Sequence, residues 1–349
     1  MDKKSLIASF AAIQACALLA ADQPATLASD VKEGKVSNLL ESIEPGNMMI
    51  TDYIRLGVEA EFIGRYREGS VQTEESQDDF YFDTLDISLD INVSENISFK
   101  TVFEYDDYED DFGVDTAQFD IKLNDNLSFT VGKAYIPFGR FSTDMITDPF
   151  TEDFAEICET TVGATYNFDD TLIFSAWLYQ TDIEDEFNNY ALTSEFRTAD
   201  WLSFGVAFVS DIAAGYLQER YFETQPSGNY DQTAGINVWF ALTPSEKFRF
   251  YGEFIGALDN IDFMGGETPR AWSFDASYDA TDVVTVAARY EGASSFGTAM
   301  HYISSRFGGA VKYAYNDFIT FGVEYMFAEY ENIEEDGSHE FAGSVAIEF

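Results

Sequence analysis

The longest polar segment between apolar stretches, residues 137–157, holds charged side chains at short spacings. They are Arg140, Asp144, Asp148, Glu152 and Asp153. Carboxylates that ring a narrow aqueous passage attract cations and repel anions, because low-dielectric walls focus their potential. If the chain forms a channel, these five residues are candidates for the side chains that set its ion preference. The alternative is an exposed acidic loop that lies over a channel mouth without narrowing it.

A second set of charged residues falls on the polar phase of segments in which apolar and polar residues alternate. Its basic members are Arg55, Lys100, Arg249, Arg289 and Lys312, and its acidic members include Glu59, Glu61, Glu104, Asp275 and Glu324. If these segments surround a lumen, the cations could form a basic wall that faces the acidic loop. Charge compensation among many lumen acids explains the same cations equally well, and both interpretations stay open.

Few residues suit metal or nucleophilic chemistry. The chain has two His, which excludes a His-rich metal site, and of its two Cys, Cys16 lies in the N-terminal apolar stretch, so no disulfide framework is expected. The acidic run 106–111 lacks the glycine expected at position six of a calcium loop. We predict no metal, no cofactor and no enzymatic activity. His301, with Ser304 and Ser305 nearby, leaves a barrel hydrolase as a remote alternative without a recognisable motif.

The composition excludes two further classes. Across 349 residues, Lys plus Arg is 19 and Asp plus Glu is 63, which gives a formal net charge of −44. Such a chain repels the phosphates of nucleic acid, so we expect no nucleic-acid partner. The aromatic fraction of 16% is too high for a disordered acidic chain.

The N-terminal residues predict export from the cytoplasm. Lys3 and Lys4 precede an apolar stretch, and small residues lie just before position 22, so residues 1–21 are expected to be a signal peptide. Residues 22–52 are expected to form a periplasmic segment. Within it, Val36, Leu39 and Ile43 recur at helical spacing, which predicts a short helical stub.

From residue 53 to residue 349 the hydrophobic period is two. The alternation indicates half-buried strands, and the polar face is too charged to be a protein core. Lys133 is an exception on the apolar phase, which a bulge or a position at the membrane rim would explain. Sixteen runs are expected: 53–66, 79–93, 97–106, 113–123, 127–136, 158–168, 171–182, 188–198, 201–212, 230–243, 247–259, 269–279, 283–292, 304–315, 318–330 and 338–349.

The links between these runs alternate in length. Every second link is a polar turn of two or three residues, such as 124–126 and 316–317, whereas links such as 137–157 and 213–229 are long. This parity is typical of outer-membrane barrels, with short turns in the periplasm and long loops outside. We therefore predict an all-β transmembrane antiparallel barrel of 16 strands, in the bacterial outer membrane, in contact with lipid and lipopolysaccharide. Aromatic belts are expected near the strand ends at Tyr66, Tyr105, Tyr290, Trp201, Tyr315 and Phe349.

Three segments resemble a known family. Gly132 to Phe141, Gly-Lys-Ala-Tyr-Ile-Pro-Phe-Gly-Arg-Phe, and Met145 to Thr151, Met-Ile-Thr-Asp-Pro-Phe-Thr, are similar to the G-K-x-Y-x-P-F-G segment of the LbtU-family siderophore porins. Residues 265–272 also resemble a family segment. The resemblance implies passive passage of iron–siderophore complexes. By resemblance to general porins, the loop 137–157 is expected to narrow the lumen, and the candidates for the channel constriction are Arg140, Asp144, Asp148, Glu152 and Asp153. A general cation-selective porin is the alternative, and a homo-oligomer is possible.

Overall fold

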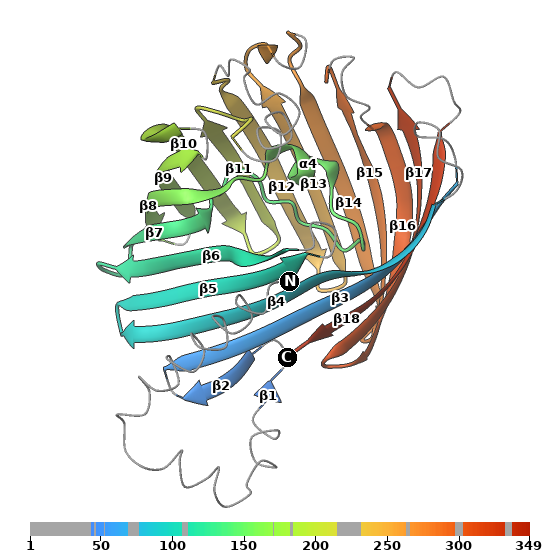
Figure 1. Ribbon diagram of the computed structural model, residues 1–349, viewed down its shortest axis with the longest axis horizontal. Helices are drawn as coiled ribbons and strands as arrows, with labels where there is room; N and C mark the ends of the chain where they lie inside the picture. Colours follow the sequence, from blue (N-terminus) through green and yellow to red (C-terminus); the bar gives the residue numbers. More distant parts are fainter. Residues whose placement is uncertain are drawn as a thin grey trace, which may run out of the picture.

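The computed structural model describes the chain with several gaps and contains one large sheet (Figure 1). The described residues are 43–44, 47–51, 53–68, 77–106, 111–169, 171–181, 184–214, 232–262, 266–296, 303–331 and 337–349. The expected signal peptide and most of the expected periplasmic segment therefore lie outside the described residues. No helix in the described ranges is both long enough and apolar enough to cross a membrane.

Sixteen strands, β3 to β18, form a closed antiparallel barrel, as predicted. Each strand pairs with the next along the chain, and β18 pairs with β3 from His339↔Glu68 to Glu348↔Glu59, which closes the ring. Closure leaves no free sheet edge at this seam, as a bilayer requires. The strands are β3 (Ile54–Glu68), β4 (Gln77–Ser94), β5 (Ile97–Asp106), β6 (Asp111–Lys122), β7 (Leu127–Tyr135), β8 (Cys158–Phe168), β9 (Leu172–Thr181), β10 (Glu184–Ala199), β11 (Leu202–Val209), β12 (Gly235–Ser245), β13 (Phe248–Ala257), β14 (Arg270–Thr281), β15 (Val284–Ser294), β16 (Ile303–Asn316), β17 (Ile319–Tyr330) and β18 (Ser338–Glu348).

The two faces of the sheet differ in polarity because successive side chains point to opposite sides. Along β13, Phe248, Phe250 and Phe254 are exposed on the outer face, while Arg249 and Glu253 point inward to partners in the lumen. The same alternation leaves large apolar side chains exposed around the barrel, which is the surface that acyl chains solvate. Among the expected belt aromatics, Tyr105 is half-buried, and the other five are exposed near strand ends: Tyr66, Tyr290, Trp201, Tyr315 and Phe349.

The links keep the predicted parity at one end of the barrel. At the short-turn end, strands are joined by turns such as 95–96 and 317–318. At the opposite, long-loop end, the links include 136–157 and 210–234, but two of them are short, at 107–110 and 182–183. The alternation of short and long links is therefore less strict than the sequence suggested.

The N-terminal segment differs from the predicted stub. The described part of this region contains two short strands, β1 (Ile43–Glu44) and β2 (Asn47–Thr51), which pair with each other. β2 also pairs with β3, from Met48↔Leu56 to Thr51↔Ile54. Ile43 is therefore in a strand rather than in a helix, because its backbone pairs with Met48 of β2, which itself pairs with β3. The rest of the expected helix lies outside the described residues.

The wall between β6 and β7 is only partly paired. Their ladder stops at Ala117↔Lys133, although β6 continues to Asp111 alongside β5. Gly132 has a φ of 139°, which L side chains rarely adopt, and a Cβ on it would lie 2.1 Å from the carbonyl oxygen of Ala117. The register of β7 with β8 has no shift, so Lys133 stays on the outer phase, and its ammonium donates to the Val114 carbonyl at 3.0 Å. A bulge lies in the neighbouring β5–β6 pairing rather than in β7.

The link between β7 and β8, residues 136–157, folds inside the barrel. It contains the short helix α4 (Phe150–Ala155), which contacts β13, β14 and β15 and lies within the outline of the barrel in Figure 1. Phe138, Phe154 and Ile157 from this inner loop pack in the largest apolar cluster, together with inward residues of the wall such as Trp177 and Ile255. A smaller apolar cluster joins Met145 of the loop to Ala287, Ala310 and Met326 of the wall, so the apolar contacts lie where the loop meets the barrel.

Candidate functional site

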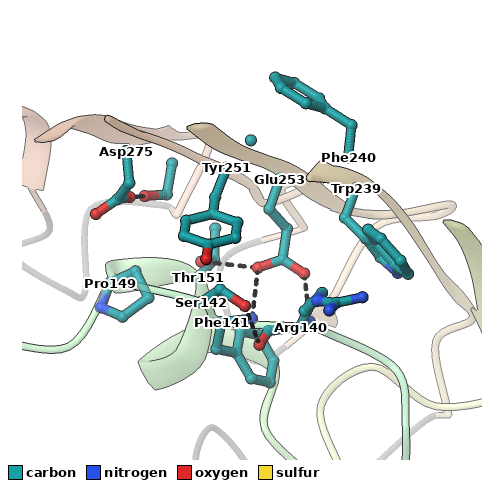
Figure 2. A pocket seen from close by; sticks show the side chains of 12 residues that line it. Arg140, Phe141, Ser142, Pro149, Thr151, Trp239, Phe240, Tyr251, Glu253 and Asp275 are labelled. Atoms are coloured by element: carbon teal, nitrogen blue, oxygen red, sulfur yellow. Dashed lines mark hydrogen bonds between the residues drawn. The ribbon is translucent and has the colours of Figure 1, made fainter. Parts of the chain in front are cut away.

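Glu253 on β13 holds the first part of the inner loop against the wall. Its carboxylate accepts the backbone N–H of Arg140 at 2.8 Å and that of Phe141 at 3.3 Å. The Asn237 amide donates to it at 2.8 Å. The Thr151 hydroxyl, labelled in Figure 2, donates to it at 3.3 Å. Glu253 is 7% exposed, so its charge is stabilised by these donors instead of water.

A second carboxylate, Glu324 on β17, holds the middle of the loop. It accepts the backbone N–H of Ile146 at 2.6 Å and that of Thr147 at 3.3 Å, and the Thr147 hydroxyl donates at 2.6 Å. Asp275 on β14 accepts from the Thr143 hydroxyl at 2.8 Å. Successive stretches of the loop are thus bound to different strands, which fixes its path across the lumen.

Two buried arginines bind the loop where α4 begins. Arg289 and Arg306 donate to the Asp148 carbonyl oxygen at 2.9 and 3.1 Å. Arg306 also donates to Glu291, and Glu291 accepts the Phe150 N–H at 2.8 Å. Arg289 pairs with Asp275 at 3.1 Å. These charges compensate one another within the protein, as buried ions require.

The opposite face of the inner loop is open to the lumen and is acidic. Asp148 and Asp153 are exposed there, and Glu152 and Glu156 are partly exposed. Partial burial raises the pKa of Glu152. The neighbouring carboxylates raise it further, and among them Asp148 has the largest effect. Confinement also raises the pKa of Glu156 to about 7, with Asp115 and Asp148 adding to the effect. Four carboxyl groups therefore share one narrow space.

The wall that faces these acids carries charges of both signs. Arg65 on β3 is exposed, and its positive charge attracts the carboxylates of both Asp148 and Asp153. Asp148 also lies close enough to Glu61 of β3 for their charges to repel, and the same holds for Glu104 of β5 and Glu156. Acidic side chains thus lie on both sides of the passage beside the inner loop. Arg65 is a basic residue on the wall side of the same passage.

The five predicted constriction residues all lie on the inner loop, in three different settings. Asp148, Glu152 and Asp153 are on its open face, as described above. Asp144 instead faces the wall, where it accepts from Arg249 at 3.0 Å and from Ser277. Arg140 places its guanidinium 4.6 Å from the ring centre of Trp239.

The predicted basic residues do not gather into one water-facing wall. Arg289 is 2% exposed beneath the inner loop, and Arg249 bridges Asp144 and Asp279. Lys100 pairs with Asp120 at 3.0 Å on a different part of the barrel. Arg55 lies near the short-turn end of β3. Lys312 lies on the inner phase of β16, where its positive charge attracts the Glu61 carboxylate.

The predicted lumen acids divide into two groups. Glu59, Glu61 and Glu104 lie on the inner phase of β3 and β5, facing the open lumen. Asp275 and Glu324 are inward but only 7% and 5% exposed, because the inner loop covers them. They hold the loop instead of lining the water path.

Sequence reasoning missed Glu253, Glu291, Arg306 and Arg65. All four share the inner phase of their strands, so the alternation itself could have identified them. No pattern in the sequence indicates which stretch of wall the loop covers. In the described ranges, no group of three or more His, Cys, Asp or Glu residues could hold a metal ion. The acidic tip at 107–110 and His301 lie outside the described residues.

Similar folds occur among solved outer-membrane proteins. The anion-selective porin from Comamonas acidovorans shares 8% identity at a TM-score of 0.64, over 85% of this chain and 99% of that chain. The outer-membrane channel DcaP of Acinetobacter baumannii shares 11% at 0.61, over 85% and 97%. Salmonella typhi OmpF, in complex with daunomycin, shares 11% at 0.60, over 85% and 98%. No family model and no curated protein matches the chain.

The fold is therefore that of porin-like outer-membrane barrels with 16 antiparallel strands. The closed ring, the apolar outer surface and the charged interior agree with a location in the bacterial outer membrane. The family of siderophore porins is not confirmed by any of these comparisons, because identities near 10% establish the fold alone.

Proposed function

We propose that the protein is a passive outer-membrane porin whose lumen is narrowed by the inner loop and favours cations. The observation that carries this proposal is the two-sided loop: one face is bound to buried carboxylates of β13, β14, β15 and β17, and the other presents acids to the lumen. Sixteen strands leave an aqueous channel, and the loop occupies part of it.

Electrostatics support cation preference. The formal charge of the chain is −44, and the open face of the loop carries Asp148, Glu152, Asp153 and Glu156. Many wall cations are neutralised locally, as Arg289 is by Asp275. The mobile ions in the passage therefore experience a negative potential, which weakens as salt screens it.

Bilayer recordings test this function. In a potassium chloride gradient, the reversal potential of the parent channel should indicate cation preference. Replacing the two exposed loop acids, in the variant with Asp148→Asn and Asp153→Asn, should move it toward zero. The matched control Asp317→Asn removes the same kind of charge from a short turn and should leave it unchanged. A parent channel that prefers anions, or one without conductance, would refute the proposal.

Iron–siderophore complexes are the solute that the two motif segments suggest. Their support is the resemblance at 132–141 and 145–151, which places the motif on the inner loop and the strand before it. Iron-starved cells that lack the protein should take up ferric siderophore more slowly, and restoring the gene should restore uptake. Equal uptake with and without the protein would leave the general cation-selective porin, which the acidic lumen alone favours.

Two further proposals concern partners and chemistry. We propose contact with lipopolysaccharide around the barrel and assembly of identical subunits. A Vibrio cholerae outer-membrane protein of similar fold is described in a trimer form, at a TM-score of 0.55 and 11% identity, over 85% of this chain and all of that chain.

The hydrolase alternative gains no support from the described serines. Ser304 donates to the Glu329 carbonyl and Ser305 to its carboxylate, each at 3.0 Å.

A further inference from the structure

Arg140 is arranged differently from the cations that hold the inner loop. Its backbone N–H binds Glu253, and its side chain extends from the loop over the indole of Trp239 on β12, as Figure 2 shows. Gly205 on the neighbouring strand makes room for that indole, since a Cβ there would lie 2.4 Å from Trp239 Nε1. The stack orients the guanidinium while 40% of the Arg140 side chain stays exposed.

A second guanidinium lies beside the first. Arg197 on β10 donates through Nε to Oε1 of Glu195 at 2.7 Å, and Nη1 of Arg140 approaches the same oxygen at 3.7 Å. The Arg197 side chain is 48% exposed and the Glu195 side chain 23%. Two guanidinium groups therefore share one carboxylate, Glu195, close to the buried carboxylate of Glu253 that binds the Arg140 backbone.

This sharing distinguishes the pair from the cations that hold the inner loop. Arg249 contacts two carboxylates, Asp144 and Asp279, and Arg289 and Arg306 are buried beneath the loop. The guanidinium of Arg140, in contrast, has no acceptor within hydrogen-bonding distance among the described residues. Its planar donors are thus available to a group that enters the lumen.

We propose that Arg140 and Arg197 form a binding site for a carboxylate of a permeating solute. A guanidinium fork matches the two oxygens of a carboxylate, and the shared Glu195 keeps the binding weak enough for release. Because the open face of the loop attracts ammonium groups, the lumen would favour solutes that carry an ammonium and a carboxylate over solutes with a carboxylate alone. The inference rests on the proposed porin function and specifies its solutes.

Single-channel recording with two matched probes tests this site. The probes are the zwitterionic dipeptide alanyltryptophan and its C-terminal amide, which lacks only the carboxylate. In the parent channel, the dipeptide should interrupt the current for a measurable mean time. Arg197→Gln should shorten that time about threefold, the effect of removing one charge about 6 Å away in a water-like medium. The mean time for the amide should be unchanged or slightly longer.

Three controls keep the outcome unambiguous. Arg197→Lys retains the charge and should keep most of the blocking time. Lys122→Gln removes a cation near a short turn, where Lys122 pairs with Asp125, and should leave both probes unaffected. Adding Arg140→Gln to Arg197→Gln should shorten the dipeptide block further.

Failure of this inference differs from failure of the porin function. Equal shortening for both probes in Arg197→Gln would show a change of lumen shape and overturn the site, as would the same effect from Lys122→Gln. A parent channel that conducts but holds the two probes without dependence on Arg197 would overturn the site and leave the porin. A protein that conducts no current at all would overturn the porin proposal itself.

Discussion

Removing the Glu253 carboxylate tests whether the wall fixes the inner loop. In Glu253→Ala, the Arg140 N–H and the Asn237 amide each lose a hydrogen bond of 2.8 Å. The Phe141 N–H and the Thr151 hydroxyl each lose a weaker hydrogen bond of 3.3 Å. A hydrogen bond to a charged group contributes about 1.5–3 kcal/mol, so the short bond from the Arg140 N–H alone stabilises the loop position by about that amount. The longer bonds from Phe141 and Thr151 add to it, whereas Asn237 lies on the wall and does not hold the loop. Loss of that amount frees the first part of the loop.

The expected result is a noisier channel with an altered conductance in an intact barrel. The ladders of β13 with β12 and β14 do not use this side chain, so the heat-resistant folded form in detergent should persist. Glu253→Gln keeps one acceptor oxygen and should lie between the parent and Glu253→Ala. Glu59→Ala, which removes an inward acid from the facing wall, is the matched control.

Planar-bilayer recordings of these variants at equal salt give a direct comparison. If Glu253→Ala shows the conductance and open-channel noise of the parent, the carboxylate does not hold the loop and the reasoning is wrong. If Glu59→Ala reproduces the noise of Glu253→Ala, the noise reports lost charge instead of a released loop.

Three further results are expected. The pKa of Glu156 is raised to about 7, so its carboxyl group is neutral below that pH and charged above it; cation selectivity should therefore increase from pH 6 to pH 8, and Glu156→Gln should flatten that part of the profile. Gly205→Ala forces a Cβ against Trp239 and should lower the unfolding temperature in detergent, corresponding to about 1–3 kcal/mol, whereas Gly113→Ala, where a Cβ meets nothing within 4 Å, should not. Protease added to intact cells should cut within 213–229 but not within 124–126, and the reverse pattern would invert the orientation.

The strands could be predicted from the sequence because a membrane barrel imposes one rule along its whole length. Each outer residue meets lipid and each inner residue meets water or the loop, so the period of two persists, and the run expected at 158–168 is the observed β8. Lys133 broke the pattern, but its ammonium is satisfied by the Val114 carbonyl where the β6–β7 ladder ends. A single charge was therefore a local sign of an unpaired backbone.

The site was predictable only in part. The position of the acids within 137–157 was evident, yet the sequence does not distinguish Asp148, which faces the lumen, from Asp144, which binds Arg249. That difference depends on which strands the loop crosses, and this is a property of the closed barrel. The helical spacing before residue 47 was misleading at Ile43, because short strands are decided by available partners more than by their own pattern.

The shared edge of β3 has a consequence for how the barrel assembles. The β2–β3 hairpin is local, whereas His339 and Glu68 of the closing seam are 271 residues apart (339 − 68), so loop-closure entropy delays the seam relative to the hairpin. Once the hairpin has formed, the backbone of Leu56 is paired with Met48 of β2. Phe349 pairs with Val58, two residues further along β3, through backbone hydrogen bonds of 2.6 and 2.9 Å. A two-residue slip of β18 would bring Phe349 against a position already taken. β2 thus acts as a register stop for the last strand.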